Sequence, residues 1–365
     1  MKTVAEFRVQ YSRILDPDGT AVAPLPQFAT DAAEVLRMYR AMTLVRVFDA
    51  KAVNLQRTGQ LGTYPSSVGH EAAHIGIGAA MRAEDVLAPV YREFGTQLWR
   101  GVTMAEILTY WGGDERGNDF AVPRQDFAWC VPIATQTLHA AGAAMAFKVL
   151  KQPRCALAYI GDGGTSEGAF YEALNLAGSR ALPVVFVIVN NGWAISVPVS
   201  AQTAAQTLAQ KAVAAGIPGA QVDGNDVFAV RQAVGGALEA ARRGAGPSLI
   251  EALTYRLSDH TTADDASRYR RGEEVKEAWA LEPLRRIRAF LLNGGLWDAA
   301  REQALLEECT VQVDAAVTEY LGNAKPSTDA MFDHLFAELP AHLHEQRLIA
   351  RKYASKPGRQ APDGH

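Results

Sequence analysis

The stretch 161–191 constrains the fold of this chain more than any other feature of its sequence. An apolar run at 155–160 ends at a glycine-rich turn, a helical pattern follows, and a second apolar run occupies 184–189. This order of strand, turn, helix and strand predicts one βαβ unit. Both runs are almost wholly apolar, which is typical of parallel strands that helices cover on both faces. Because ligands of such sheets bind beyond the carboxyl ends of the strands, we expect Asp162 and Asn191 at a binding site.

The residue types at these strand ends suit a site for a metal ion and a diphosphate. Asp162 and Asn191 offer hard oxygen ligands, and Mg²⁺ commonly completes its octahedron with phosphate oxygens. Gly161, Gly163 and Gly164 let backbone N–H groups come close to such oxygens, and the helix that follows adds partial positive charge. The alternative is an ordinary strand-to-helix turn beside a polar strand end, and Gly-Asp-Gly by itself does not exclude it.

A family resemblance extends this interpretation to nearly the whole chain. Gly-Asp-Gly followed by Asn-Asn after residues 164–189 resembles the motif of thiamine-diphosphate (ThDP) enzymes. Three further segments resemble the α subunit of the E1 component of 2-oxo acid dehydrogenase complexes: NNGWAISVP, QVDGNDVFAV and LIEALTYRLSDHTTADDASRYR. The resemblance covers about residues 31–345. It implies oxidative decarboxylation of a 2-oxo acid with ThDP and Mg²⁺, and transfer of the acyl group to the lipoyl arm of the E2 component.

The resemblance assigns the metal ion and the cofactor rings to named positions. Asp162, Asn191 and the backbone carbonyl of Trp193 would be the protein ligands of Mg²⁺. Ile133 would be the apolar prop that forces the two cofactor rings into a V, and Ile195 would contact the aminopyrimidine ring. The small-residue helix that follows Ile133 is otherwise explained as a buried helix.

The resemblance also assigns the diphosphate and the reacting centre. Tyr91-Arg92 matches a pair that meets ThDP, with Arg92 and the 161–164 turn on the diphosphate; guanidinium forms paired bonds to phosphate oxygens, although a lone arginine is usually solvated. His260 would be the active-site imidazole, since histidine transfers protons near neutral pH. Without the resemblance, the polar segment around His260 is typical of a mobile surface loop. Branched-chain members carry a second histidine where this chain has Asp259.

The segment before that small-residue helix raises the question of a K⁺ site. Pro132, Thr135 and Gln136 match a monovalent-cation loop of the branched-chain members. Cys130 stands where those members carry serine, so the resemblance leaves the K⁺ site open.

The segment His70-Glu71-x-x-His74 matches the zinc-peptidase pattern, in which two histidines share one face of a helix. Five-residue patterns arise by chance, and the sequence offers no evident third ligand downstream. We therefore keep a zinc peptidase only as a remote alternative. Glu71 is expected in the active-site wall or at the N-terminal N–H groups of the helix.

Strand and helix patterns alternate from 155 to 255, which predicts an α/β fold with a doubly wound, mostly parallel sheet, here the ThDP-binding fold with helical N- and C-terminal extensions. We expect an N-terminal arm at 1–30, an α/β domain at 31–325 and a helical C-terminal tail at 326–365.

The bulk properties fit a metabolic enzyme. The formal net charge of −4 indicates neither a nucleic-acid partner nor an anionic membrane. No apolar run reaches the roughly 18 residues of a membrane span, and no signal peptide is apparent. The three cysteines form no Cys-x-x-Cys pair, which favours a reducing compartment, the cytoplasm.

One part of the implied machinery is missing from this chain. ThDP activation needs a glutamate at the aminopyrimidine, and the residues after 255 are too few and too helical for the second α/β domain that supplies it in single-chain relatives. In two-chain E1 enzymes the glutamate comes from the β subunit. We therefore expect an α₂β₂ heterotetramer and an inactive isolated α chain.

The substrate is the least constrained prediction. GDGGTSEGAFYEALNLAG and LAQKAVAAGIPG resemble bacterial pyruvate dehydrogenase α subunits, whereas VPIATQ and QVDGNDVFAV resemble the branched-chain enzymes. The sequence favours pyruvate, with 3-methyl-2-oxobutanoate as the alternative.

Overall fold

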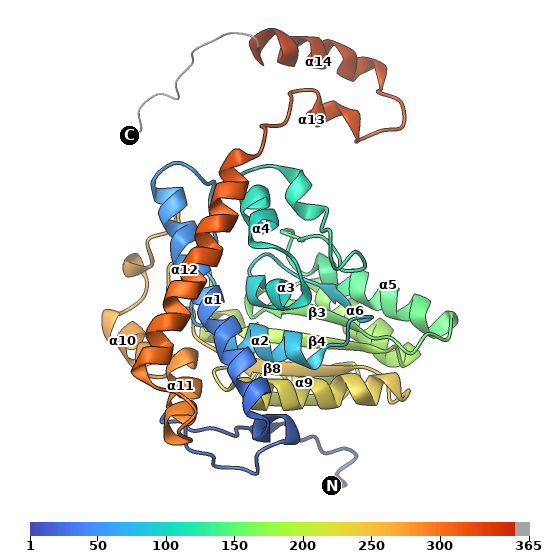
Figure 1. Ribbon diagram of the computed structural model, residues 1–365. Helices are drawn as coiled ribbons and strands as arrows, with labels where there is room; N and C mark the ends of the chain where they lie inside the picture. Colours follow the sequence, from blue (N-terminus) through green and yellow to red (C-terminus); the bar gives the residue numbers. More distant parts are fainter. Residues whose placement is uncertain (355–365) are drawn as a thin grey trace. The chain divides into compact units, whose positions relative to one another are not determined.

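The computed structural model describes residues 1–354, and within them an α/β fold is built on a six-stranded sheet (Figure 1). The strand order is β1-β7-β8-β4-β3-β2, and every neighbouring pair is parallel. The strands are β1 (Gln10–Ser12), β2 (Val86–Ala88), β3 (Ala156–Gly161), β4 (Val184–Asn190), β7 (Gly219–Asp223) and β8 (Ser248–Leu253). A separate antiparallel hairpin pairs β5 (Trp193–Ala194) with β6 (Val197–Pro198). The predicted doubly wound parallel sheet is confirmed.

Helices cover both faces of the sheet because its strands are apolar on both sides. In β3, Leu157 and Tyr159 join the core beneath α1 (Ala32–Arg57), α2 (Glu71–Ala80) and α9 (Val227–Arg242). The alternate residues Ala156 and Ala158 join the core beneath α5 (Thr135–Val149) and α6 (Gly168–Arg180). Because successive side chains of a strand point to opposite faces of the sheet, β3 contributes residues to both hydrophobic cores.

The other helices lie in the connections and in the C-terminal third of the chain. They are α3 (Phe94–Arg100), α4 (Met104–Trp111), α7 (Val199–Gln202), α8 (Lys211–Ala214), α10 (Gly272–Ala280), α11 (Pro283–Asn293), α12 (Ala299–Gly322), α13 (Ala330–Asp333) and α14 (Ala341–Ala354), with short 3₁₀ turns at η1 (Gln27–Thr30), η2 (Glu115–Asn118), η3 (Gly163–Ser166) and η4 (Ala266–Arg268). None of the helices in residues 1–354 combines the length and apolar character that crossing a bilayer requires.

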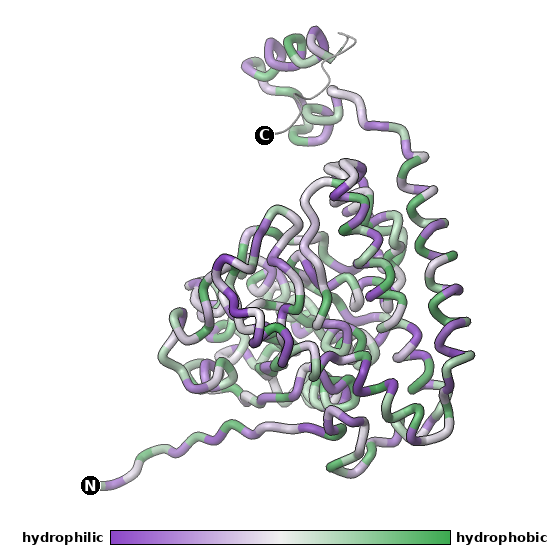
Figure 2. Tube along the Cα trace, turned by 90° about the vertical axis from the view of Figure 1, so that its left-hand side faces the viewer, coloured by the Kyte–Doolittle hydropathy of each residue, from purple (hydrophilic) through white to green (hydrophobic). Residues whose placement is uncertain are grey.

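Part of the N-terminal segment, where an arm was expected at 1–30, pairs with the sheet. β1 pairs with β7 at the sheet edge, and Ile14 and Leu15 are buried. Their backbone N–H groups both donate to Asp226 Oδ2 at 2.7 Å, while Oδ1 of the same carboxylate caps α9. Residues 1–8 are exposed and run out as an extended tail in Figure 2.

The described chain divides into two compact units, Met1–Tyr320 and the residues from Leu321 onward. The C-terminal tail expected at 326–365 begins a few residues after the end of α12 at Gly322. In the second unit, Asp329 accepts hydrogen bonds from Arg347 and Arg351, and no residue of α13 or α14 is buried. Part of the predicted tail, 355–365, lies outside the described residues.

Candidate active site

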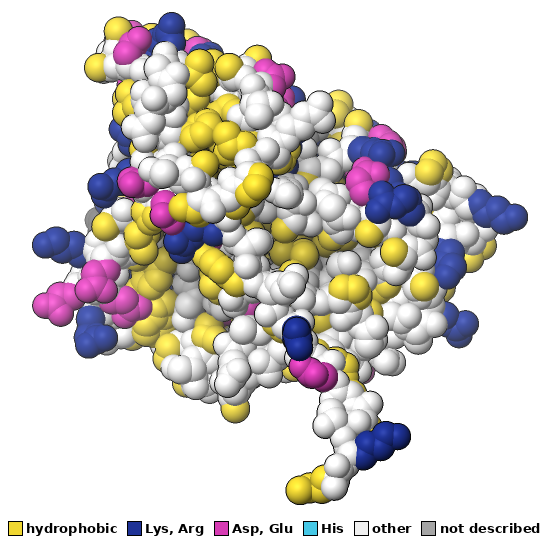
Figure 3. Space-filling view, turned by 90° about the horizontal axis from the view of Figure 1, so that it is seen from below, with side chains coloured by type: hydrophobic (Ala, Val, Ile, Leu, Met, Phe, Trp, Pro, Cys, Tyr) yellow, Lys and Arg dark blue, Asp and Glu magenta, His cyan; other side chains and the backbone are white. Residues whose placement is uncertain are grey.

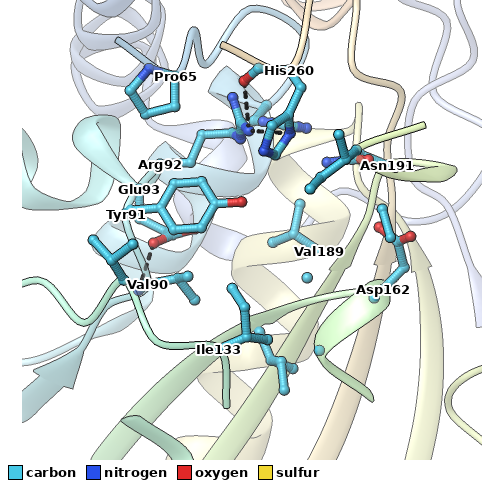
Figure 4. A pocket seen from close by; sticks show the side chains of 18 of the residues that line it. Pro65, Val90, Tyr91, Arg92, Glu93, Ile133, Asp162, Val189, Asn191 and His260 are labelled. Carbon is cyan, nitrogen blue, oxygen red and sulfur yellow. Dashed lines mark hydrogen bonds between the residues drawn. The ribbon is translucent and has the colours of Figure 1, made fainter. Parts of the chain in front are cut away.

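A cavity of about 560 Å³ opens at the carboxyl ends of β3 and β4 (Figure 4). All the residues predicted to contact ThDP or Mg²⁺, and the predicted catalytic histidine, line it, although they come from five separate segments of the chain. They are Tyr91, Arg92, Ile133, Gly161, Asp162, Gly163, Gly164, Asn191, Trp193, Ile195 and His260. The structure therefore brings the whole predicted set together.

The two polar strand ends are immediate neighbours. Gly161 in β3 pairs with Val189 in β4, so Asp162 and Asn191 leave adjacent strands at the same edge. Their side chains are 2% and 8% exposed. Burial raises the pKa of Asp162, while hydrogen bonds from Gln202 Nε2 at 2.9 Å and from the Asn191 backbone oppose the rise. Asn191 Oδ1 accepts the Trp193 backbone N–H at 3.2 Å.

The glycines of the turn are required by close packing on both of its sides. A Cβ at Gly163 would lie 2.5 Å from Ala194 Cβ in the β5–β6 hairpin. A Cβ at Gly164 would lie 2.6 Å from Ile160 Cγ1 and 3.0 Å from Ile133 Cγ2. A Cβ at Gly161, by contrast, would meet nothing within 4 Å. Gly163 and Gly164 are thus packed tightly against neighbouring side chains, whereas the space beside Gly161 is open.

Two buried arginines enclose the imidazole of His260. Arg92 Nη2 lies 3.2 Å from His260 Nδ1 and donates to its carbonyl at 3.0 Å, and Arg256 Nη1 lies 3.3 Å from the same Nδ1. Burial first, and then the two guanidinium charges, lower the pKa of His260 to about 3. Because a guanidinium can only donate, Nδ1 accepts, and the neutral ring carries its proton on Nε2.

Arg256 connects this imidazole to the rest of the site. The residue is fully buried, and Nη2 donates to the Ile195 carbonyl and to Tyr269 Oη, both at 2.8 Å, while Nη1 donates to the Trp193 carbonyl at 3.3 Å. The sequence did not single out Arg256, because an arginine after a strand is usually solvated. The one sequence feature that could have indicated Arg256 is its position just after a buried strand, where ligand sites form in such sheets.

The loop that carries His260 is held by side-chain hydrogen bonds. Asp264 accepts the His260 backbone N–H at 2.9 Å and the Tyr269 hydroxyl. Arg270 donates to the carbonyl of Ser258 at 2.8 Å. The polar residues that are typical of a mobile loop are here the partners that order it.

Arg92 is oriented from the opposite side by a buried aspartate. Its Nη1 donates to the Ser66 carbonyl at 2.5 Å. Asp49 in α1 holds this segment by accepting from Ser66 Oγ at 2.6 Å, from the Ser67 backbone N–H at 2.6 Å and from Tyr64 Oη at 3.2 Å. No sequence pattern pointed to Asp49. It is found only when the contact between α1 and the segment after it is known.

Glu93 is a further cavity residue that sequence reasoning missed. Its Oε2 accepts the Val90 backbone N–H at 2.8 Å, as Figure 4 shows. Burial raises the pKa of Glu93 to about 7. The wall beside Tyr91 therefore holds a buried carboxyl group that binds a proton more readily than an exposed glutamate does.

The two histidines of the zinc-peptidase pattern lie in the cavity wall, but its glutamate does not. His70 and His74 line the cavity and are both buried. Glu71, expected in the cavity wall, does not line it; its carboxylate accepts from Arg46 Nε at 2.5 Å and from the Gly69 backbone N–H at 3.0 Å. Within residues 1–354 no group of three His, Cys, Asp or Glu side chains is arranged to hold a metal ion. The remote zinc alternative thus has no third ligand there.

The predicted K⁺ loop places its residues beside the cavity. Gln136 is buried, and its Nε2 donates to the Tyr159 carbonyl at 2.6 Å, whereas no partner contacts its Oε1 within the described chain. Cys130 Sγ lies 3.5 Å from the Pro132 carbonyl.

Backbone strain gathers at the rim of the cavity. Ile195 has φ +55° and Ala134, which follows Ile133, has φ +66°. A β-branched residue in the left-handed region is a genuine outlier. The hydrogen bond from Arg256 to the Ile195 carbonyl holds this conformation in place.

A parallel sheet with a buried Asp–Asn pair at its carboxyl edge, and a buried arginine–imidazole cluster in the same cavity, is typical of an α/β enzyme with a ligand site beyond the strand ends. The chain belongs to the dehydrogenase E1 component family, whose family model matches residues 39–328. The resemblance found in the sequence is thereby confirmed.

Two groups of relatives match almost the whole chain. It is 42% identical over 340 residues to the 3-methyl-2-oxobutanoate dehydrogenase subunit alpha of Mycobacterium tuberculosis, covering 92% of each protein. It is 38% identical over 353 residues to the pyruvate dehydrogenase E1 component subunit alpha of Staphylococcus aureus, covering 96% of this chain and 95% of the relative.

Proposed function

We propose that this chain is the α subunit of a ThDP-dependent E1 component that oxidatively decarboxylates a 2-oxo acid. The observation that supports this proposal best is the position of Asp162 and Asn191 at the ends of paired strands, inside one cavity with Arg92. Membership of the E1 family supports the same reaction class.

The residues present fit Mg²⁺ and a diphosphate. Asp162 supplies a buried carboxylate and Asn191 a buried amide, which are hard ligands. Gln202, which binds Asp162, has an Oε1 that no partner contacts within the described chain. The open side of Gly161 and the guanidinium of Arg92 suit phosphate oxygens. The Trp193 carbonyl accepts a weak bond from Arg256 and keeps a second lone pair for the metal.

When bound, ThDP supplies the carbon nucleophile and the electron sink for loss of CO₂. The chain's own residues position and polarise the reactants. Ile133 and Ile195 offer apolar contacts to the cofactor rings, and Tyr91 packs edge-on against His260 with ring centroids 6.2 Å apart. His260, neutral and protonated on Nε2, donates a hydrogen bond or a proton to the reacting oxygen.

We further propose that the activating glutamate comes from an E1 β subunit in an α₂β₂ assembly, and that the acyl group passes to the lipoyl group of an E2 acyltransferase. The test is turnover with ThDP, Mg²⁺ and a dye acceptor. The α chain alone is expected to be inactive, and addition of β should restore activity; equal rates would contradict the proposal.

Cofactor binding can be measured without turnover. Trp111 and Trp193 line the cavity, so a ThDP titration followed by tryptophan fluorescence should show saturable quenching. The quenching should require Mg²⁺. Magnesium-independent binding would contradict the assignment of Asp162 and Asn191.

Two further proposals concern a K⁺ ion and the cellular location. A K⁺ ion beside Gln136 would satisfy its free Oε1, but sulfur at Cys130 is a softer ligand than the serine it replaces. The three cysteines are free thiols, which supports a cytoplasmic location.

The substrate is proposed as a 2-oxo acid with a short aliphatic side chain. The sequence favours pyruvate, whereas the branched-chain relative has the higher identity, 42% against 38%. Steady-state kcat/KM of the reconstituted α/β pair for pyruvate and for 3-methyl-2-oxobutanoate separates the two.

A further inference from the structure

Two histidines in the cavity wall have no role in the function proposed above. His70 and His74 are four residues apart at the start of α2, so they share one face of the helix. Each is 1% exposed, both line the cavity, and their ring centroids are 5.7 Å apart. Within residues 1–354, none of their four ring nitrogens has a hydrogen-bond partner. Buried polar groups are normally paired, so this wall is built for a ligand.

Both rings are neutral donors. Burial, and then the charge of Arg92, lower the pKa of His74 to about 3. Burial, His74, Arg92 and Arg256 hold the pKa of His70 well below its usual range. A neutral imidazole carries one N–H donor and one acceptor nitrogen. With the proton of each ring on the nitrogen that faces the cavity, the pair can present two N–H donors to a ligand.

The electrostatics decide between a cation and an anion. The positive potential of Arg92 and Arg256 that disfavours protonation of the rings also disfavours a divalent metal ion. It favours an anion, and two N–H donors match the two oxygens of a carboxylate. The proposed reaction brings two anions into the cavity, the cofactor diphosphate and the substrate carboxylate. The diphosphate already has proposed partners in the 161–164 turn, Arg92 and the metal ion at Asp162, whereas the carboxylate has none.

We propose that His70 and His74 form the subsite for the carboxylate of the 2-oxo acid, each donating one ring N–H to it. This inference rests on the proposed function. The negative charge leaves the carboxylate as CO₂ departs, so these hydrogen bonds are stronger in the bound substrate than in the transition state. They should lower KM without raising kcat.

The test compares a 2-oxo acid with the matching aldehyde, which lacks the carboxylate. In the dye assay, R–CO–COO⁻ and water give R–COO⁻, CO₂, two electrons and two protons, whereas R–CHO and water give R–COO⁻, two electrons and three protons; the dye takes the electrons in both. With the reconstituted α/β pair, His70→Leu and His74→Leu should each raise KM for the 2-oxo acid roughly ten- to a hundredfold. KM for the aldehyde should stay unchanged, and kcat for the 2-oxo acid should stay the same or rise, because the lost bonds favour the bound substrate over the transition state.

Companion variants keep the test decisive. His70→Gln and His74→Gln retain an N–H donor and should recover part of the lost affinity. If a leucine variant does not assemble, the corresponding asparagine variant, polar but too short to reach, should show the same selective rise. His139→Leu removes an exposed imidazole on α5 and should change neither KM.

Three results would overturn the inference. KM could rise equally for both substrates, KM could stay unchanged in every variant, or the wild-type protein could hold zinc that is lost with His70→Leu. A wild-type α/β pair that fails to bind ThDP or to use any 2-oxo acid would instead refute the proposed function, so the two failures are distinguishable.

Discussion

The cavity has two walls of opposite construction. The strand-end wall, Gly161–Gly164 with Asn191, is made of backbone and short oxygen-bearing side chains that leave adjacent strands. The imidazole wall contains His70, His74 and His260 together with the guanidinium groups of Arg92 and Arg256, and its residues come from three chain segments. One wall offers ligands to a cation, and the other offers donors to anions.

This difference explains how a chain with a net charge of −4 can take up an anionic cofactor and an anionic substrate. The surface carries no overall attraction for anions, and on the face seen in Figure 3 the charged side chains lie mostly around the rim. The binding charge is instead buried in the imidazole wall, where it acts at close range and is little screened by salt. The neutral histidines then add donors without adding charge.

The largest expected effect comes from the strand-end wall. Asp162→Ala removes the buried carboxylate and with it the charged ligand proposed for Mg²⁺. ThDP-dependent turnover of the α/β pair should fall by about three orders of magnitude or more, because a close metal–carboxylate contact is worth several kcal/mol. Magnesium-dependent fluorescence quenching should disappear as well. Glu319→Ala, on the exposed side of α12, is the matched control and should behave as wild type. Activity that survives in Asp162→Ala would break the contrast between the walls.

The two walls also differ in how far sequence could predict them. The strand-end wall follows from the local pattern of apolar strand, glycine turn and helix, and register in a parallel sheet brings Asp162 beside Asn191. Resemblance then added Arg92 and His260. These predictions used residues near strand ends or within recognisable motifs.

The supports of those residues could not be predicted in the same way. Gln202 reaches Asp162 across 40 positions of sequence, by way of the β5–β6 hairpin. Asp49 in α1 binds a segment whose path depends on tertiary packing. Arg256 stands in a polar segment that gives no sign of burial, and only the fold shows that its side chain is buried. The N-terminal strand β1 was missed because three residues at a sheet edge carry too little periodicity.

The second prediction concerns the arginine fork of the imidazole wall. Arg256→Lys keeps the charge but cannot reach the carbonyls of Trp193 and Ile195 and the hydroxyl of Tyr269 together. We expect kcat/KM to fall by roughly one to two orders of magnitude, the cost of losing hydrogen bonds to a charged group. Trypsin should also cleave the His260 loop faster.

Arg285→Lys, an exposed arginine that donates to one carbonyl at 3.3 Å, is the control for the arginine-to-lysine change itself. If trypsin cleaves the loop of Arg256→Lys at the wild-type rate, Arg256 does not order it. The loop would then be held by its other hydrogen bonds, which involve Asp264, Arg270 and Arg92.

The third prediction uses the pH dependence of the free energy of unfolding. In the folded chain the pKa of His74 is about 3, and that of His70 is also low. Below the unfolded value of about 6.5, the unfolded chain takes up protons that the folded chain cannot, so stability falls as pH decreases toward 3. Each histidine should contribute a slope of about 1.4 kcal/mol per pH unit. Asp162, whose pKa is raised, acts in the opposite sense.

Urea unfolding between pH 5 and 7 measures this slope. His74→Leu should flatten it by the contribution of one histidine, whereas His139→Leu, which removes an exposed ring, should leave it unchanged. A slope that is the same in His74→Leu and in wild type would mean that the ring is protonated in the folded protein. That result would remove the basis for treating the imidazole wall as neutral.

The smallest expected effect comes from relieving backbone strain, and it compares a strained residue in the cavity with one outside it. Ile195 at the cavity and Ala181 at the end of α6 both have positive φ, +55° and +45°. Replacing either by glycine relieves a conformational cost of about 1 kcal/mol, offset in part by the greater entropy of glycine in the unfolded chain. Both variants should therefore unfold at equal or slightly higher urea concentration.

Ala181→Gly should leave ThDP affinity unchanged, because Ala181 does not line the cavity. Ile195→Gly should weaken it severalfold, since the strained backbone, held by Arg256, is what aims an apolar side chain into the space between the two walls. Equal ThDP affinity in the two variants would show that the left-handed turn at Ile195 is a consequence of the hairpin fold and has no part in binding.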